Sequence, residues 1–171
     1  MKKPTLYITM GLPASGKTYF SQQLAAELDT FFLNCDNLRL AMFEKPTFSP
    51  EEHAMVYRTV AFIAEQHLAQ GQSIICNANY HIHNRREAMQ ELARACGAKY
   101  KILWVQTPYE VVKERIQSRE HEIPVEKMVH PPLELLEKMS RAFEEPRDDE
   151  PVIIIDGTQP YEVQKRQYEQ A

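Results

Sequence analysis

Short apolar runs alternate along the chain with longer stretches in which apolar residues recur at helical spacing. Five of these runs have the length and composition of buried strands, which are short and rich in β-branched or aromatic residues. An alternation of strands and helices predicts a parallel sheet with helical crossover connections. The predicted strands are Leu6–Met10, Phe31–Asn34, Ser73–Cys76, Lys101–Val105 and Val152–Ile155.

Helix-start and helix-stop residues stand between the predicted strands. Ser49, Pro50 and Glu52 supply an N-cap, a proline at the first helical position and a capping-box glutamate. The helix that they open is expected to end near Gln70, because Gly71 can adopt the left-handed conformation that follows a helix. Similar patterns predict helices over Thr18–Leu28, Leu38–Met42, Arg86–Cys96, Val111–Gln117 and from Tyr161 onwards.

The charge-rich segment from Arg119 to Asp149 contains no predicted strand. Apolar residues recur there at helical spacing, so one helix face is expected to pack on the rest of the protein. The stretch Arg119–His130 is expected to be exposed and mobile. Because no repeat or linker divides the chain, we predict one α/β domain over residues 1–171 with a lid at about 116–130. The recurring apolar residues are Leu133, Leu136, Met139 and Phe143.

The composition is that of a globular protein with little surplus charge. Lys+Arg 20 against Asp+Glu 24 gives a formal net charge of −4, which argues against a protein that holds long nucleic acid mainly by neutralising phosphates. A grip on one nucleotide or one strand end stays possible. The apolar runs are too short for a membrane span or a secretory signal. Because Cys35, Cys76 and Cys96 resemble reduced core residues, we expect a cytoplasmic protein.

The motif with the most specific chemistry is a phosphate-binding loop. Residues 11–18 match the Walker A pattern G-x-x-x-x-G-K-[ST], with a predicted strand before them and a predicted helix after them. Backbone N–H groups of such a loop point at phosphate oxygens, Lys17 reaches the β- and γ-phosphates, and the Thr18 hydroxyl is a magnesium ligand. The sequence therefore predicts binding of ATP and Mg²⁺, with GTP as an alternative to ATP. The loop consists of Gly11, Leu12, Pro13, Ala14, Ser15, Gly16, Lys17 and Thr18.

The residues after the second predicted strand are candidates for an acceptor site. Ligands in open α/β sheets bind beyond the carboxyl ends of the strands. Asp36 could accept a proton from an acceptor hydroxyl, and Arg39 could hold an anionic part of the same acceptor. Asp36 could equally be the N-cap of the helix that contains Leu38–Met42.

The third predicted strand is followed by further polar candidates. Asn77 lies where many phosphate-loop enzymes carry an acidic residue, and an amide can bind water without adding charge. Asn79, Arg85 and Arg86 are candidates for binding the acceptor, although both arginines could simply be solvated. His81 and His83 have the spacing of a ligand pair, but no third residue at a recognisable spacing would complete a metal site.

Two candidates lie later in the chain. Arg115 and Arg119 are one helical turn apart, and an arginine on a closing lid can stabilise a phosphoryl group in transfer. A solvated helix face is the alternative. Thr158 lies in a turn after the last strand, which could contact the adenine or be an ordinary connection.

These motifs resemble, in order and spacing over about residues 4 to 165, the phage-type polynucleotide 5′-hydroxyl kinases. They are also similar to the wider group of small P-loop kinases with an AAA-type ATP-binding domain, which includes zeta toxins, seryl-tRNA kinases and gluconate kinases. The resemblance rests on the phosphate loop, Asp36 with Arg39, residues 77–79, the arginine pair 85–86 and residues 115–119.

The resemblance implies a three-layer fold with a five-stranded parallel sheet in the order 2-3-1-4-5. It implies that Asp36 is the general base, that Arg39 binds the acceptor and that Arg115 or Arg119 is the lid arginine. It likens Ile123–Met128 and residues 143–146 to the lid and the helix that follow. Asn77 is a departure, because polynucleotide kinases of this type usually carry Asp there.

The leading hypothesis is a phosphotransferase that moves the γ-phosphate of ATP to an acceptor hydroxyl, foremost the 5′-hydroxyl of a nucleic acid. A small-molecule kinase acting on a sugar, nucleoside or nucleotide-sugar is a close alternative. An ATP-binding switch and a nucleotide-binding protein without turnover are further alternatives. No membrane partner and no metal cluster are expected.

Overall fold

The computed structural model of the protein describes residues 3–120 and 133–171, with the side chains of residues 119 and 120 left out. Its five strands are all parallel, as the sequence pattern predicts, and lie in the order β2-β3-β1-β4-β5, as the resemblance implies. The strands are β1 (Thr5–Met10), β2 (Phe31–Asn34), β3 (Ile74–Asn77), β4 (Lys99–Gln106) and β5 (Val152–Asp156). The helices are α1 (Lys17–Glu27), α2 (Cys35–Met42), α3 (Pro50–Ala69), α4 (His83–Ala95), α5 (Tyr109–Glu120), α6 (Leu133–Arg141) and α7 (Tyr161–Glu169).

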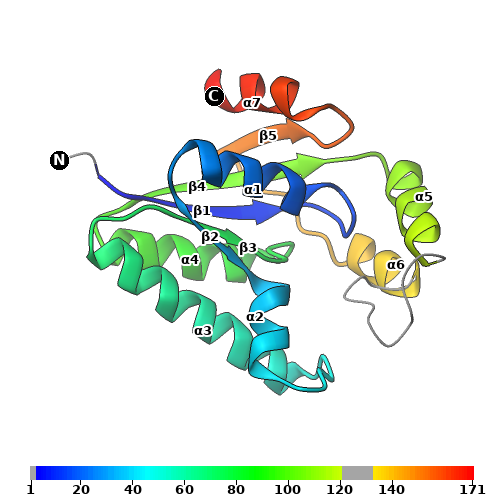
Figure 1. Ribbon diagram of the computed structural model, residues 1–171, viewed down its shortest axis with the longest axis horizontal. Helices are drawn as coiled ribbons and strands as arrows, with labels where there is room; N and C mark the ends of the chain where they lie inside the picture. The colour runs from blue at the N-terminus through cyan, green and yellow to red at the C-terminus, as the bar shows by residue number, and fades with distance from the viewer. Residues whose placement is uncertain (1–2, 121–132) are drawn as a thin grey trace.

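The sheet is the middle of three layers (Figure 1). Helices α1 and α7 cover one face and helices α3 and α4 cover the other, while α2 packs on α3. Helices α5 and α6 lie at the edge where the strands end. All the strand ends therefore open on the same side of the molecule, which is where ligands bind in folds of this kind.

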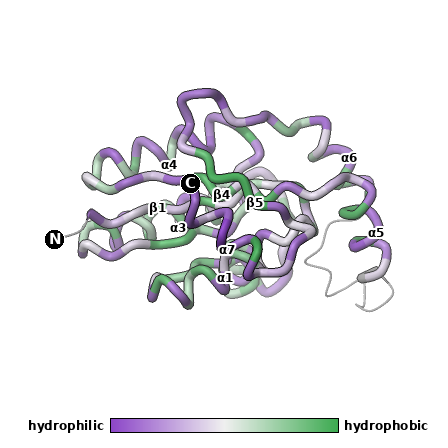
Figure 2. Tube along the Cα trace, turned by 90° about the horizontal axis from the view of Figure 1, so that it is seen from above, coloured by the Kyte–Doolittle hydropathy of each residue, from purple (hydrophilic) through white to green (hydrophobic). Residues whose placement is uncertain are grey.

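The strands are apolar on both faces because both faces are covered. In β1, Leu6, Ile8 and Met10 belong to the core under α3 and α4, whereas Tyr7 belongs to the core under α1 and α7. Figure 2 shows the hydrophobic colouring concentrated along the strands and the hydrophilic colouring on the outer helices. A third apolar cluster joins α5 and α6 to Leu12 of the phosphate loop.

The structure moves some predicted boundaries. Helix α4 begins at His83, three residues before the predicted start at Arg86, and β4 is longer than predicted at both ends. Helix α3 has the predicted Ser49 cap and runs to Ala69, and Gly71 has the left-handed φ of 76°. These differences are small because caps mark helix ends only to within a residue or two.

The predictions for the charge-rich segment fare unevenly. Leu136 and Met139 are buried on α6, as expected from their spacing. Phe143 lies beyond the end of α6 and stacks on Trp104 of β4, and residues 143–146 form no helix, contrary to the resemblance. Most of the predicted lid, including Ile123–Met128, lies outside the described residues. In the described ranges, no helix is both long enough and apolar enough to cross a membrane.

Candidate functional site

The phosphate loop connects β1 to α1 through residues in unusual backbone conformations. Gly11 and Gly16 have φ values of 144° and 103°, and Ala14 has a φ of 56°. A side chain at Gly11 would come within 2.8 Å of the Ser15 hydroxyl oxygen and would overlap the Val105 carbonyl oxygen. Glycine is therefore required at position 11 both by conformation and by space. Gly16 occupies the cap position of α1, so the positive end of that helix faces the loop.

Lys17 lies inside the curl of this loop. Its Nζ donates hydrogen bonds to the carbonyl oxygens of Gly11 at 3.0 Å and Leu12 at 2.7 Å. Burial lowers the pKa of Lys17 to about 8, and the negative charge of Asp36 opposes that shift. The ammonium group is thus poised for an anion in the loop, and Asp36 is near enough for their charges to interact.

Thr18 follows Lys17 and belongs to a chain of three polar side chains. Asn77 Nδ2 donates to Thr18 Oγ1 at 2.9 Å, and Thr9 Oγ1 donates to Asn77 Oδ1 at 3.0 Å. Thr9 and Asn77 are buried. Asn77 therefore fixes the hydroxyl that we expect to meet magnesium, and it does so with an uncharged amide.

The described residues contain no group of three His, Cys, Asp or Glu side chains that could hold a metal ion. A Mg²⁺ ion at Thr18 would therefore need oxygen ligands from nucleotide phosphates and water, which is the usual way that this ion is bound. The site fits an ion that arrives with its nucleotide.

Asp36 lies in the first turn of α2, at the end of β2. The N-cap of α2 is Asn34, whose side chain accepts hydrogen bonds from the N–H groups of Asp36 at 2.9 Å and Asn37 at 3.1 Å. The alternative in which Asp36 caps this helix is therefore wrong. The Asp36 side chain is exposed at the edge of the sheet and interacts electrostatically with Lys17.

Arg39 lies one turn further along α2 but is buried. One terminal nitrogen of its guanidinium pairs with Glu52, and the other lies 3.0 Å from His53 Nδ1. Burial opposes ionisation of Glu52, yet hydrogen bonds from Thr47 and Arg39 hold its pKa at about 2. Both side chains are buried and bonded to each other, so Arg39 is not placed to hold an acceptor anion directly.

Arg85, by contrast, lies partly exposed between α2, α3 and the loop after β3. Its guanidinium carbon lies 4.4 Å from the centre of the Tyr57 ring. The Tyr57 hydroxyl donates to the Asn79 carbonyl oxygen at 2.8 Å and accepts from the Asn79 N–H at 3.2 Å. Burial lowers the pKa of His81 to about 4, and the positive charge of Arg85 contributes to that shift. Arg85 therefore supplies a positive charge beside the ends of β2 and β3.

Arg86 is the neighbour of Arg85 in sequence but is fully buried. Its Nε and Nη2 donate to the two carboxylate oxygens of Glu150 at 2.7 and 3.1 Å. The remaining donors bond carbonyl oxygens of Tyr80, Glu144 and Glu145. These contacts use the hydrogen-bonding capacity of the guanidinium, so its observed position favours a structural role over a role in acceptor binding.

Arg115 clamps the phosphate loop from outside. Its guanidinium donates to the carbonyl oxygens of Ala14 at 3.2 Å, Ser15 at 3.3 Å and Gly157 at 3.0 Å. A side chain at Gly157 would overlap the Ser15 carbonyl oxygen and the Thr107 hydroxyl. The turn after β5 is thus packed against the phosphate loop.

The other two late candidates are placed less directly. Thr158 lies in the turn beside Gly157, and its N–H and hydroxyl donate to Asp156 at 2.9 and 2.6 Å. The side chain of Arg119 lies outside the description, so its expected role as a lid arginine stays a prediction. Among the earlier candidates, Lys17, Thr18, Asn77 and Asp36 lie at or beside the phosphate loop, whereas Arg39 and Arg86 are held in buried ion pairs.

Three residues that support this region were not among those predicted for the site. Asn34 caps α2, Tyr57 anchors Asn79, and Glu52 pairs with Arg39. Glu52 has the spacing of a capping-box residue, but its carboxylate bonds Thr47 and Arg39. The Asn34 cap is local and asparagine is a preferred cap residue, so the sequence could have indicated it. Tyr57 and Asn79 are 22 residues apart, and only the folded chain brings them together.

Residues 6–146 match the family described as AAA domain. The chain belongs to the AAA domain family. A search of curated proteins found no match. The resemblance to P-loop kinases is confirmed at the level of the family and the fold.

Solved structures of similar fold include a gluconokinase, a Kti12 protein and a chain of an RNA repair complex. A gluconokinase from Sinorhizobium meliloti 1021 is 18% identical with a TM-score of 0.71, covering 98% of this chain and 90% of that chain. Kti12 from Chaetomium thermophilum in complex with ADP-AlF3 is 19% identical with a TM-score of 0.76, covering 98% and 96%. A chain of the Pnkp1/Rnl/Hen1 RNA repair complex is 22% identical with a TM-score of 0.70, covering 83% and 44%. At these identities the likeness establishes the shared fold.

Proposed function

We propose that this AAA-domain protein is a magnesium- and ATP-dependent phosphotransferase whose acceptor is a 5′-hydroxyl at the end of a nucleic acid. The observation that carries the proposal is the exposed Asp36 carboxylate beside the phosphate-loop Lys17. The two charges interact, and Asn34 rather than Asp36 caps helix α2. A carboxylate in that place can accept the proton of a hydroxyl that attacks the γ-phosphate.

The phosphate loop binds the triphosphate through its backbone N–H groups and Lys17. Lys17 leaves the carbonyl oxygens of Gly11 and Leu12 to meet the phosphates. Thr18 would hold Mg²⁺, which spreads the negative charge of the phosphates when it is bound. Asn77 orients the Thr18 hydroxyl for that role.

The transfer forms one bond and breaks one bond. The acceptor oxygen bonds to the γ-phosphorus while the bond from that phosphorus to the β–γ bridging oxygen breaks, which leaves ADP. The hydroxyl proton passes to Asp36. Arg85, held over Tyr57, supplies positive charge for an acceptor phosphate, and Asn79 lies beside it. Arg115 keeps the phosphate loop in place, and we assign Arg119 to the developing charge on the transferred group.

The nucleic-acid acceptor is supported by the order of motifs and by the fold shared with the RNA repair complex chain. The fold shared with a gluconokinase keeps a small-molecule acceptor as the second candidate. The positive charge of Arg85 favours an acceptor with a phosphate of its own, which a nucleic-acid end supplies.

The test is transfer of label from γ-labelled ATP with Mg²⁺ to 5′-hydroxyl DNA, 5′-hydroxyl RNA, nucleosides, sugars and nucleotide-sugars. The Lys17→Ala variant, which lacks the phosphate-loop lysine, measures the background label. Asp36→Asn keeps the size of the side chain and should lose about 10²- to 10⁴-fold in transfer rate while it keeps its ADP affinity. Label on sugars alone would overturn the nucleic-acid acceptor. An Asp36→Asn protein as active as wild type would overturn the proposed base.

A further inference from the structure

The loop between α2 and α3 presents an aromatic side chain in a strained conformation. Phe48 is 47% exposed and has a φ of 56°, in the left-handed region that bulky residues rarely adopt. Strain of this kind persists only where the surrounding structure holds it in place. Phe48 is therefore held in position by its surroundings.

The residue that holds this backbone is Glu52. One of its carboxylate oxygens accepts hydrogen bonds from the N–H of Thr47 at 2.6 Å, the hydroxyl of Thr47 at 2.9 Å and the N–H of Phe48 at 3.2 Å. The other oxygen pairs with Arg39. Because Glu52 and Arg39 are both buried, the loop is fixed from beneath.

The Phe48 ring is backed on one side by charged and aromatic groups. The guanidinium carbon of Arg39 lies 4.8 Å from the ring centre, and the His53 ring centre lies 6.3 Å away at 56°. Nearly half of the side chain nevertheless remains in contact with solvent. An aromatic ring that is held in place by its neighbours and remains partly exposed to solvent is suited to stacking.

The position of the ring places it on the acceptor side of the proposed site. Asp36 and Arg39 lie three residues apart on α2, with Asp36 exposed and Arg39 buried. Phe48 packs on Arg39, so the ring contacts the same helix that carries Asp36. The loop that carries it lies at the same side of the molecule as the strand ends (Figure 1).

We propose that Phe48 is a stacking platform for a nucleobase of the acceptor, close to the hydroxyl that is phosphorylated. Arg39 and Glu52 are positioning residues that act through Phe48. This inference rests on the proposed function and narrows its acceptor to a molecule with a flat heterocyclic ring. Aromatic side chains stack on any base, so the platform tolerates different sequences.

The test compares wild type with Phe48→Ala and Phe48→Trp, using a 5′-hydroxyl oligonucleotide and the same oligonucleotide with an abasic residue at its first, second or third position. Loss of one base–aromatic stack should raise the KM for the intact oligonucleotide about 5- to 150-fold in Phe48→Ala. The kcat and the KM for ATP should stay near the wild-type values. Phe48→Trp should retain affinity, and one abasic oligonucleotide should bind wild type and Phe48→Ala equally.

Phe62→Ala is the matched control, because Phe62 is 60% exposed in the middle of α3 and has no ring contact with Arg39. It should bind the oligonucleotide like wild type. Phe48→Gly can adopt the left-handed φ without strain, so it should melt no lower than Phe48→Ala and should still lose affinity. A loss of affinity that follows the melting temperature across these variants would overturn the platform.

The two proposals fail in different ways. If wild type labels the intact oligonucleotide and Phe48→Ala has the same KM, the platform is overturned and the proposed function stands. If wild type labels only sugars and does not bind the oligonucleotide with ADP present, the nucleic-acid function and the platform both fall. Equal KM losses in Phe48→Ala for the intact and all the abasic oligonucleotides would also overturn the platform.

Discussion

Two neighbouring arginines on α4 should respond in opposite ways to the same substitution. Arg86→Met removes a fully buried guanidinium that bonds both carboxylate oxygens of Glu150, itself almost completely buried. Breaking a buried pair by removing one partner costs about 3–5 kcal/mol, because the other charge stays buried. With a urea dependence of about 2 kcal/mol per M, the unfolding midpoint should fall by about 2 M.

The pH dependence of this loss follows from Glu150. Burial would raise the pKa of Glu150, but hydrogen bonds from Arg86 and Arg147 outweigh it and hold the pKa below its ordinary value. In wild type this pair stabilises the fold at neutral pH, and the contribution is lost as the pH falls below the ordinary carboxyl range. Without Arg86, burial should raise the pKa of Glu150. The Arg86→Met deficit should therefore be largest at pH 7 and should shrink toward pH 5.

Arg85→Met is the control from the adjacent position. The Arg85 guanidinium is partly exposed and rests on Tyr57, so its loss should cost only about 0.5–1 kcal/mol of unfolding free energy. Its KM for a phosphate-bearing acceptor should rise instead. Urea unfolding at pH 5 and 7, with transfer kinetics at 25 °C, measures both effects. Wild-type stability in Arg86→Met, together with a raised acceptor KM, would refute the structural role assigned to Arg86.

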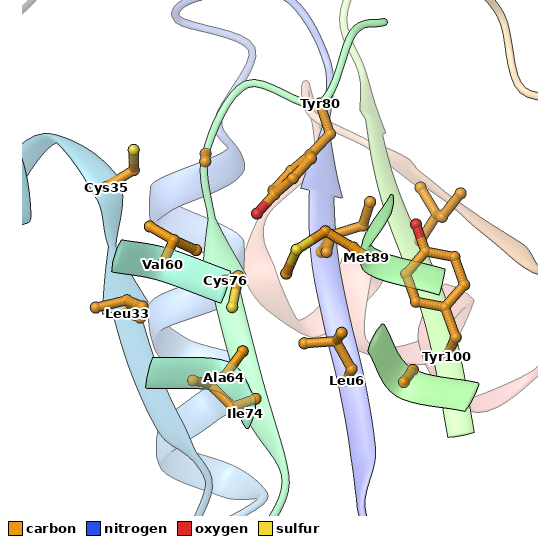
Figure 3. Close-up of a cluster of buried hydrophobic side chains, with 14 of the residues drawn as sticks. Leu6, Leu33, Cys35, Val60, Ala64, Ile74, Cys76, Tyr80, Met89 and Tyr100 are labelled. Carbon is orange, nitrogen blue, oxygen red and sulfur yellow. The ribbon is translucent and has the colours of Figure 1, made fainter. Parts of the chain in front are cut away.

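Three further predictions concern the interior and the phosphate loop. Burial lowers the pKa of Lys17 to about 8, so the affinity for ADP should fall by up to tenfold per pH unit above pH 8, and binding there should take up a proton. Calorimetry in two buffers measures both effects, and an ADP affinity that does not change with pH would contradict the prediction. The buried Tyr80 hydroxyl has no hydrogen-bond partner among the described residues, and its ring lies among the core side chains of Figure 3. Tyr80→Phe should therefore leave the unfolding free energy unchanged or raise it by up to about 1–3 kcal/mol, measured by urea unfolding. Asn77→Asp adds a negative charge beside Thr18 and should lower the Mg²⁺ concentration needed for half-maximal ADP binding, whereas an unchanged magnesium titration would argue against ion binding at Thr18.

The strands and the phosphate loop could be predicted because their signals are local, whereas the strand order was implied only by the resemblance to P-loop kinases. Each strand is a short apolar run, and Gly11 to Thr18 carry a fixed spacing that needs no distant partner. The Ser49 cap is also local, since Ser49 bonds the N–H of Glu52 three residues later. Patterns of this length can be recognised in the sequence without knowledge of distant contacts.

The roles of the arginines could not be predicted, because they depend on partners far away in the sequence. Arg85 and Arg86 are adjacent and chemically identical, but α4 turns one toward Tyr57 and the other toward Glu150, 64 residues later. Arg39 follows Asp36 by one turn, yet Glu52 holds it inside the protein. The direction in which a side chain leaves its helix, toward a packed neighbour or away from it, decides whether its charge is buried or exposed to solvent.

The sequence by itself determined a parallel sheet with a phosphate loop at its edge, because periodicity and motif spacing are written along the chain. Tertiary structure decided which side chains surround that loop, because a charged side chain forms a buried ion pair with whichever opposite charge the packing brings next to it. Asp36 after β2 interacts electrostatically with Lys17 after β1, and Glu52 of α3 bonds Arg39 and the backbone of Phe48. The binding site is therefore a product of the fold, built on a loop that the sequence already specifies.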